Sequence, residues 1–281
     1  MKTITRLVTL GAIVAMLGLP VLAKSVASSD FAFQDPCTEE GKTALYTAFV
    51  ETRKTDQDKA YENAITALDL GLASRNYFNR LRLEPLLWYL FDRKSKYVDI
   101  GGGYGLLTRL MRDIGFDFLS YDIYCENIFA KSYEPGAGQK CDALFAFEVF
   151  EHIEEPLIFL KENLENYGAK TMVFSTLTFK ETIPAEDWWY YSFDIGQHVS
   201  LYQEQSIHEM ANKVGLTYYP LSNDLHIITD RKINPLFLFL YRNKTLNKLL
   251  RLFTRFFRRK ESLLNSDYEN QKRILQQLQK P

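Results

Sequence analysis

Three alternating glycines follow a short apolar stretch that contains an acid. Residues 97–105 read Y-V-D-I-G-G-G-Y-G, and an amphipathic segment follows them directly. A turn this tight requires backbone angles that a Cβ forbids, and a ligand lying against the backbone requires side chains to be absent. The pattern therefore predicts a nucleotide-cofactor site. It is not a dinucleotide fingerprint, because G-x-G-x-x-G counted from Gly101 would put a glycine where Leu106 stands.

Acids also close the next two apolar stretches. Asp122 follows residues 118–121, close to the offset of about 20 residues at which a second-strand carboxylate holds a ribose diol. Glu148 follows residues 143–147. Open α/β sheets bind ligands at the carboxyl ends of their strands, so these acids are predicted to share one site with the glycine turn.

In order and spacing these segments resemble the successive motifs of class I S-adenosylmethionine-dependent methyltransferases. The resemblance extends over about residues 81–229 and includes the pair Glu151-His152. It implies S-adenosylmethionine as cofactor, with Asp99 meeting its methionine amino group. The cofactor-binding residues that it implies are Asp99, Gly101, Gly103, Gly105, Asp122, Ile123, Phe147 and Glu148. Structural roles stay open for Asp99 as a turn cap, Asp122 as an exposed turn acid and Phe147 as a core residue.

Methyl transfer from a sulfonium requires alignment of donor and acceptor and removal of a proton from an oxygen or nitrogen acceptor. His152 either takes part in this catalysis or orders its loop. His198 belongs to a long aromatic segment, residues 177–205, which is predicted to close over the acceptor as a lid. His198 then either takes the acceptor proton or only bonds the lid backbone. The predicted acceptor pocket wall consists of Trp188, Trp189, Tyr190 and Tyr191.

Alternating strands and helices must position these groups. Helices are predicted over residues 77–91, 106–114, 156–165 and 206–214, and strands over 97–100, 118–121, 143–147, 171–175, 216–221 and 225–228. Between residues 124 and 140 a further strand and helix are poorly marked. The last two strands are three residues apart, which forces an antiparallel hairpin. The predicted fold class is α/β, a doubly wound, mostly parallel sheet of seven strands with an antiparallel terminal strand pair.

The 281 residues divide into four predicted regions. Residues 1–23 resemble a signal peptide, with Lys2 and Arg6 ahead of an uncharged run. Residues 24–74 form a helical hairpin that faintly resembles one tetratricopeptide unit, which cannot bury its own face. Residues 75–230 form the methyltransferase domain, and residues 231–281 form a basic helical tail.

Charge is distributed unevenly along the chain. The net charge is −1, yet residues 231–260 hold ten Lys or Arg and no acid. The main body is therefore acidic, which disfavours a nucleic-acid partner. In the tail, leucines and phenylalanines oppose lysines and arginines on a helical wheel. Residues 236–260 are predicted to touch an anionic membrane surface, and a docked helix with a solvated basic face is the alternative.

Three scattered cysteines indicate neither a disulfide framework nor a metal site, and no metal is predicted. Localisation stays open, because the cofactor requirement points to the cytoplasm or the cytoplasmic face of the membrane and the leader points to export. The predicted activity is transfer of a methyl group to oxygen or nitrogen of a small-molecule, lipid or glycan-intermediate acceptor. The alternative is a non-catalytic exported or membrane-associated binding protein with a Rossmann-like body. The leader favours that alternative, and the complete set of glycines and acids favours the enzyme.

Overall fold

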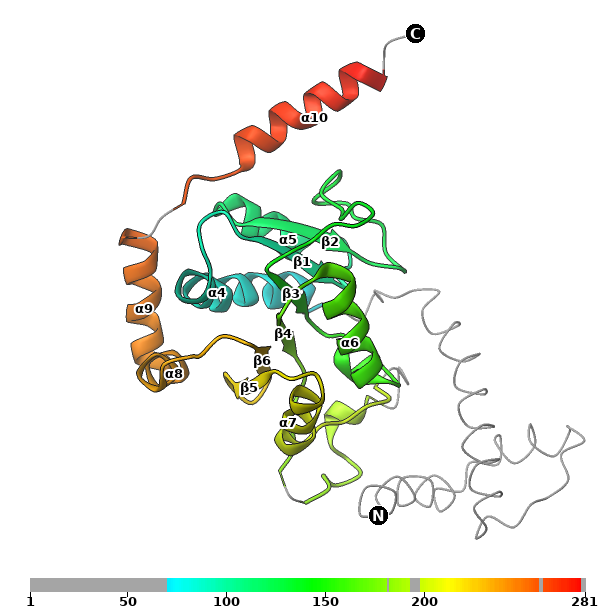
Figure 1. The fold of residues 1–281 in the computed structure, drawn as a ribbon, viewed down its shortest axis with the longest axis vertical. Coiled ribbons are helices and arrows are strands. Elements are labelled where there is room, and N and C mark those ends of the chain that lie inside the picture. Colours follow the sequence, from blue (N-terminus) through cyan, green and yellow to red (C-terminus); the bar gives the residue numbers. More distant parts are fainter. Residues whose placement is uncertain (1–69, 181, 193–197, 258–259, 279–281) are drawn as a thin grey trace, which may run out of the picture. The chain divides into compact units, whose positions relative to one another are not determined.

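The computed structural model describes residues 70–278 except 181, 193–197 and 258–259 (Figure 1). The predicted leader and nearly all of the predicted hairpin of residues 24–74 lie outside the described residues. The described part contains one sheet of six strands, which are β1 (Lys96–Ile100), β2 (Asp117–Tyr121), β3 (Ala143–Ala146), β4 (Thr171–Ser175), β5 (Thr217–Pro220) and β6 (Leu225–Thr229).

The strand order in the sheet is β2-β1-β3-β4-β6-β5. The pairs β1–β2, β1–β3 and β3–β4 are parallel, whereas β6 runs antiparallel to both β4 and β5. The helices around the sheet are α4 (Leu72–Leu90), α5 (Leu106–Asp113), α6 (Pro156–Tyr167), α7 (Glu204–Lys213), α8 (Pro235–Arg242), α9 (Lys244–Phe257) and α10 (Leu264–Leu278). The predicted α/β, doubly wound fold is confirmed.

Alternate residues of the central strands are buried in two separate cores, one on each face of the sheet. Tyr97 and Phe145 pack in the first core with α4, α5 and α8. Val98 and Leu144 pack in the second core with α6 and α7. Burial on both faces explains why these strands read as continuous apolar runs and not as an alternating pattern.

The prediction of seven strands is wrong for the described part of the chain, in which the sheet has six. No helix or strand lies between β2 and β3, where residues 122–142 form turns and irregular structure. This segment contains Pro135, Gly136 and Gly138, which disfavour a paired strand. The segment contacts β2, the edge strand of the sheet, through a hydrogen bond that the Ser120 N–H donates to the Tyr133 carbonyl at 2.8 Å.

The predicted tail packs on the domain. Tyr89 of α4 stacks on Phe237 of α8 with ring centroids 3.8 Å apart. The Tyr241 hydroxyl of α8 donates to the Arg82 carbonyl of α4 at 2.8 Å. Among the described helices, none is both long enough and apolar enough to cross a bilayer.

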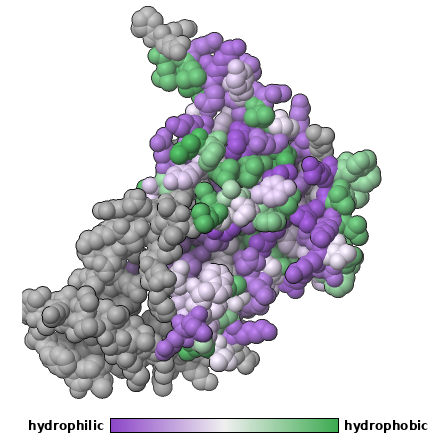
Figure 2. Space-filling model, turned by 180° about the vertical axis from the view of Figure 1, so that it is seen from behind, coloured by the Kyte–Doolittle hydropathy of each residue, from purple (hydrophilic) through white to green (hydrophobic). Residues whose placement is uncertain are grey.

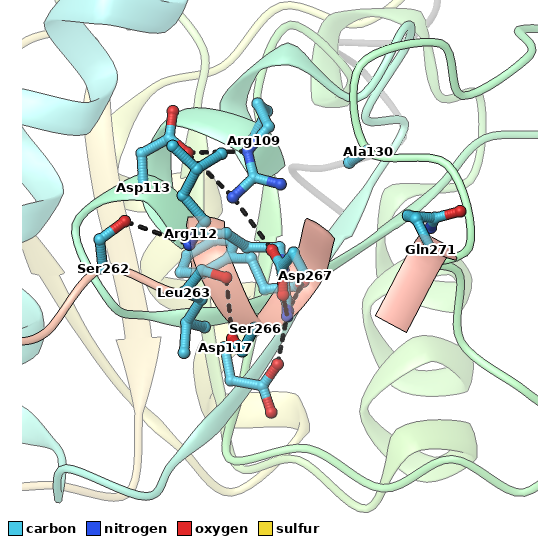
Figure 3. A network of polar contacts seen from close by, with 12 residues as sticks. Arg109, Arg112, Asp113, Asp117, Ala130, Ser262, Leu263, Ser266, Asp267 and Gln271 are labelled. Atoms are coloured by element: carbon cyan, nitrogen blue, oxygen red, sulfur yellow. Dashed lines mark hydrogen bonds and ion pairs between the residues drawn. The ribbon is translucent and has the colours of Figure 1, made fainter. Parts of the chain in front are cut away.

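A buried ion pair attaches α10 to the C-terminal end of α5 (Figure 3). Arg112 donates two hydrogen bonds to the Asp267 carboxylate, at 2.8 and 2.7 Å, and a third to Asp117 at 2.6 Å. Arg109 adds a second ion pair to Asp267 at 3.0 Å. Burial opposes the charge of Asp267, but the Arg112 bonds and charge outweigh it and lower the pKa of Asp267 below its usual value.

We expect Asp267→Asn to lower the free energy of unfolding by about 3 kcal/mol, because it leaves the Arg112 guanidinium buried and without its bidentate partner. Urea denaturation followed by circular dichroism measures the change. Asp92→Asn, at an exposed position, is the matched control and should shift stability by less than about 0.5 kcal/mol. Equal stability of the Asp267 variant and the wild type would show that the ion pair contributes nothing.

Candidate functional site

The glycine turn connects β1 to α5 in a left-handed backbone conformation. Gly101 has φ of +68° and Gly105 has φ of +77°. A Cβ on Gly101 would overlap the Val149 side chain, and one on Gly105 would overlap Asn127. Gly105 is also the N-cap of α5 and makes no side-chain cap. The first N–H groups of α5 are therefore open to an anionic group of a ligand.

Asp122 follows β2 and bonds the glycine turn. Its Oδ2 accepts a hydrogen bond from the Gly103 N–H at 2.9 Å. Its Oδ1 accepts from Tyr124 N–H at 2.7 Å and from Cys125 N–H at 2.9 Å. These bonds use three of the roughly four acceptor positions of a carboxylate. Asp122 thus orders two loops and keeps limited capacity for a ligand hydroxyl. Ile123, next to it, is 68% exposed.

Asp99 is almost fully buried beneath the turn. Burial, with the nearby negative charge of Asp122, raises the pKa of the Asp99 carboxyl to about 8. Among the described side chains, no cation offsets this shift. A buried carboxylate is costly unless a positive group accompanies it, so Asp99 is a natural partner for a ligand ammonium group.

Glu148, two residues after the end of β3, has a left-handed φ of +56°, which is uncommon for a residue other than glycine. Its N–H donates to the Ser175 hydroxyl at 2.7 Å, and that hydroxyl donates to Glu148 Oε1 at 2.8 Å. Arg75 Nε lies 3.8 Å from the other carboxylate oxygen. Phe147, half-buried, packs against the first core, which agrees with the structural alternative for this residue.

Glu151 lies in a short 3-10 turn after β3, η1 (Phe150–His152), and is fully buried. Within the described residues neither of its carboxylate oxygens accepts a hydrogen bond. The nearby Tyr190 hydroxyl favours the charged form of Glu151, but less strongly than burial opposes it. Burial, with the negative charge of Glu148, raises the pKa of Glu151 to about 8. His152, the next residue, is half-buried.

His198 lies against this turn. Its ring centroid is 5.0 Å from that of His152, in an edge-to-face arrangement. The backbone N–H groups of Val199 and Ser200 both donate to the Glu151 carbonyl, at 2.8 and 3.0 Å. His198 Nδ1 lies 2.6 Å from the Tyr190 carbonyl oxygen. Because a carbonyl can only accept, Nδ1 carries the proton and Nε2 keeps its lone pair. Burial lowers the pKa of His198 below its usual value.

The aromatic segment ahead of His198 packs mostly on itself. Tyr190 is buried and its hydroxyl accepts from the Leu177 N–H at 3.0 Å, at the end of β4. Trp188 contacts the rings of Tyr190 and Tyr191, both at 5.3 Å between centroids. Trp189 is 74% exposed. Of the four residues predicted to form the acceptor pocket wall, Trp189 is therefore the most available for contact.

The structure brings the predicted residues together in two groups at the carboxyl-terminal ends of the parallel strands. The glycine turn, Asp99 and Asp122 form the first group, and Glu148, His152 and His198 form the second. Gly101 and the Val149 side chain connect them. The sequence did not indicate that Ser175 bonds Glu148, although Ser175 ends a predicted strand and was therefore expected at the same end of the sheet. The predicted catalytic residues included His152 but not the buried Glu151 beside it.

The other two histidines lie outside both groups. His208 is exposed on α7, and its Nδ1 lies 3.1 Å from the Asn212 side-chain nitrogen Nδ2. His226 is buried in β6 between the Tyr218 hydroxyl and the Thr176 carbonyl. Burial lowers the pKa of His226 to about 4, which keeps it neutral and structural.

The first group fits S-adenosylmethionine. The glycine turn presents backbone without side chains in left-handed conformation at Gly101, Gly103 and Gly105, and the uncapped start of α5 suits a carboxylate. Asp99 offers a buried negative charge to the amino group of the methionine part. When bound, this cofactor supplies a methyl group on a positively charged sulfur that is already activated for transfer.

Comparison with known proteins identifies the family. A family model described as a methyltransferase domain matches residues 73–221. No curated protein matches the chain. The mitomycin 7-O-methyltransferase MmcR is 16% identical, with 53% of this chain and 52% of that chain covered and a TM-score of 0.37. Magnesium protoporphyrin IX methyltransferase from Synechocystis PCC 6803, solved with SAH, is 14% identical, with 66% and 97% covered and a TM-score of 0.40.

The chain spans about half the length of MmcR. The family model covers more than half of the 281 residues and includes the glycine turn, Asp99, Asp122 and the Glu151-His152 pair. This protein belongs to the family of S-adenosylmethionine-dependent methyltransferases.

Proposed function

We propose that the protein transfers a methyl group from S-adenosylmethionine to an oxygen or nitrogen atom of a small-molecule, lipid or glycan-intermediate acceptor. The observation that carries the proposal is the contact between the two groups of residues. Gly101 of the cofactor turn lies against Val149, which stands in the chain between Glu148 and His152. A methyl donor held by the turn would therefore lie close to side chains that can take a proton from the acceptor.

In the proposed reaction a lone pair of the acceptor atom forms the new bond to the methyl carbon. The bond between carbon and sulfur breaks, and its electrons stay on sulfur, which becomes a neutral thioether. The acceptor proton goes to His198 Nε2. The bond from Nδ1 to the Tyr190 carbonyl supports this role, because it leaves Nε2 as the basic nitrogen. His152, beside it, positions the ring or shares the proton.

Within the same proposal, Asp99, Gly101, Gly103 and Gly105 hold the methionine part of the cofactor, and Asp122 binds the ribose. Ile123 contacts the base, and Phe147 and Glu148 close the site. The exposure of Ile123 and the remaining acceptor position of Asp122 support these assignments. Trp189, with Trp188, Tyr190 and Tyr191 behind it, is proposed to border the acceptor.

The competing proposal is a non-catalytic binding protein with the same body. Two fully or almost fully buried carboxyls with raised pKa values, Asp99 and Glu151, favour the enzyme. Burying unpaired carboxyls costs stability, and a protein that only presented a surface to a partner would have no use for them at one sheet edge.

We further propose that α8 and α9 touch an anionic membrane surface. Leu246 and Leu250 are half-buried and Thr254 is buried, so one face of α9 docks on the domain, as the alternative predicted. A second apolar face remains exposed, next to basic residues, at the right edge of Figure 2. The large exposed apolar residues of the two helices are Leu236, Phe239, Leu249, Leu252, Phe253, Phe256 and Phe257.

A cavity of about 400 Å³ adjoins this exposed face and supports the membrane proposal. Its lining includes the cationic residues Arg80, Arg255 and Lys260, together with Phe256. The carboxylates of Glu84 and Asp113 also line it, so the cations are partly balanced. Cations beside exposed phenylalanines suit a phosphate headgroup above an acyl chain.

Asp99→Asn should weaken S-adenosylmethionine binding by about 10- to 100-fold, which corresponds to about 1.4 to 2.7 kcal/mol, because the amide cannot pair with the amino group. Isothermal titration calorimetry measures the dissociation constant. Asp142→Asn is the matched control, because Asp142 precedes β3 and lies at the opposite sheet edge. An unchanged affinity of the Asp99 variant would remove Asp99 from the cofactor site. No binding by the wild type at millimolar cofactor would contradict the proposed activity.

His198→Ala should lower kcat by about 100-fold or more if the histidine is the general base. Release of S-adenosylhomocysteine is measured with a panel of phenols, catechols and amines, and the best acceptor is used at saturation. In the wild type, kcat should rise with pH through a pKa below the usual 6.5, since the unprotonated ring is active and burial lowers its pKa. His208→Ala is the control. Unchanged turnover at saturating acceptor would exclude His198 from the mechanism.

Vesicles of phosphatidylcholine and phosphatidylserine should carry the full-length protein to the top of a density gradient at low salt. Replacing Phe253, Phe256 and Phe257 together by Ser should abolish this flotation, since the exposed apolar area is lost. High salt should weaken it by screening the basic residues. Tyr268→Ser, at an exposed position on α10, is the control. No flotation of the wild type at low salt would contradict the membrane proposal.

A further inference from the structure

Glu151, His152 and His198 form a compact group of metal-ligand type. One carboxylate oxygen and one nitrogen of each ring all lie within 4.8 Å of one another. The group draws on two separate segments, the turn after β3 and the segment that follows the aromatic residues 188–191. It lies beside the cofactor turn, because Val149, two residues before Glu151, contacts Gly101.

The Glu151 carboxylate gives a second reason to expect a ligand, separate from the short distances within the group. Its side chain is fully buried, and within the described residues neither oxygen accepts a hydrogen bond. A buried polar group without a partner costs about 1–3 kcal/mol, and more when it is charged. The backbone carbonyl of the same residue, in contrast, accepts hydrogen bonds from both Val199 and Ser200. The fold thus holds the residue firmly and leaves the carboxylate unsatisfied.

His198 is oriented in the way that protein metal ligands usually are. Ligating histidines donate the second ring N–H to a carbonyl or carboxylate, which fixes the tautomer and aims the other nitrogen. Here Nδ1 donates to the Tyr190 carbonyl at 2.6 Å, and Tyr190 is itself buried and bonded to Leu177. Nε2 therefore holds a lone pair on a ring that is fixed before any ion binds.

We propose that Glu151, His152 and His198 bind one divalent transition-metal ion of the Zn²⁺, Mn²⁺, Fe²⁺ or Co²⁺ class. Two imidazole nitrogens and one carboxylate suit these ions better than Mg²⁺ or Ca²⁺, which prefer oxygen ligands. Metal bonds of about 2.1 Å place neighbouring ligand atoms about 3.4 Å apart in a tetrahedral site, so small side-chain rotations complete it. Three protein ligands also leave a position open to a further ligand.

The consequence for catalysis depends on the proposed function. An open position next to the methyl donor favours an acceptor that binds the ion through a hydroxyl oxygen, whose pKa the ion would lower. Nε2 of His198 cannot be a ligand and a base at once. The kinetic test of His198 is therefore made on chelator-treated protein and repeated with Co²⁺. The prediction of no metal relied on cysteine spacing, which does not bear on this group of histidines and glutamate.

The test uses untagged full-length protein that has been treated with chelator and desalted. Co²⁺ titration should produce visible ligand-field absorption that saturates at one equivalent. Glu151→Gln, His152→Ala and His198→Ala should each weaken Co²⁺ binding by at least about 100-fold, since loss of an outer partner alone costs 10- to 100-fold. Glu151→Gln keeps the side-chain size, so it tests the carboxylate with little change in packing. His208→Ala should titrate like the wild type.

Calorimetry with S-adenosylmethionine on the same variants separates this inference from the proposed function. Cofactor binding by Glu151→Gln together with loss of Co²⁺ binding supports the metal site. Absence of saturable absorption in the wild type, or wild-type titration curves in all three variants, overturns it. Co²⁺ binding without cofactor binding in the wild type would contradict the proposed function and leave the metal site supported.

Discussion

The carboxylate of Asp122 joins the two loops between which the cofactor site is built. It accepts hydrogen bonds from Gly103 in the turn after β1 and from Tyr124 and Cys125 in the loop after β2. The Tyr104 carbonyl then accepts from Ile128 and Phe129, which joins the loops a second time. Glycine permits the turn but does not fix it, so this carboxylate supplies the constraint. The backbone of Gly103, between β1 and α5, is thereby tied to the loop after β2.

The second feature of the site is a pair of carboxyl groups held in a poorly solvated place. Asp99 and Glu151 are buried at the same sheet edge, and each has a pKa raised to about 8. Alone, such groups stay protonated at neutral pH and weaken the fold. A cation would offset the cost of charging each group, and the proposals supply one in each place: the amino group of the cofactor near Asp99 and a metal ion near Glu151.

Local patterns were enough to predict most of the sheet. The strand of residues 171–175 has the predicted bounds, and the other strands differ by one or two residues, because apolar runs between glycines and acids mark them. What the sequence could not indicate depends on distant contacts. The unsatisfied state of Glu151 becomes visible only when Val199 and Ser200 fold against its carbonyl. The two hydrogen bonds between Ser175 and Glu148 likewise join the end of β4 to the residues that follow β3.

The absence of a seventh strand from the described sheet explains why the tail packs where it does. The β2 edge is met by the irregular segment of residues 122–142, which has little structure of its own. Gln271 of α10 donates to the Lys131 carbonyl of that segment at 2.6 Å. The Arg112 guanidinium, bound to Asp267, lies over the Tyr133 ring at 3.7 Å, and the Tyr133 carbonyl in turn pairs with β2. The C-terminal helix therefore supports the edge that a further strand and its helix would otherwise cover. The predicted boundary near residue 230 separates two regions of different charge, but it does not divide two independent folding units.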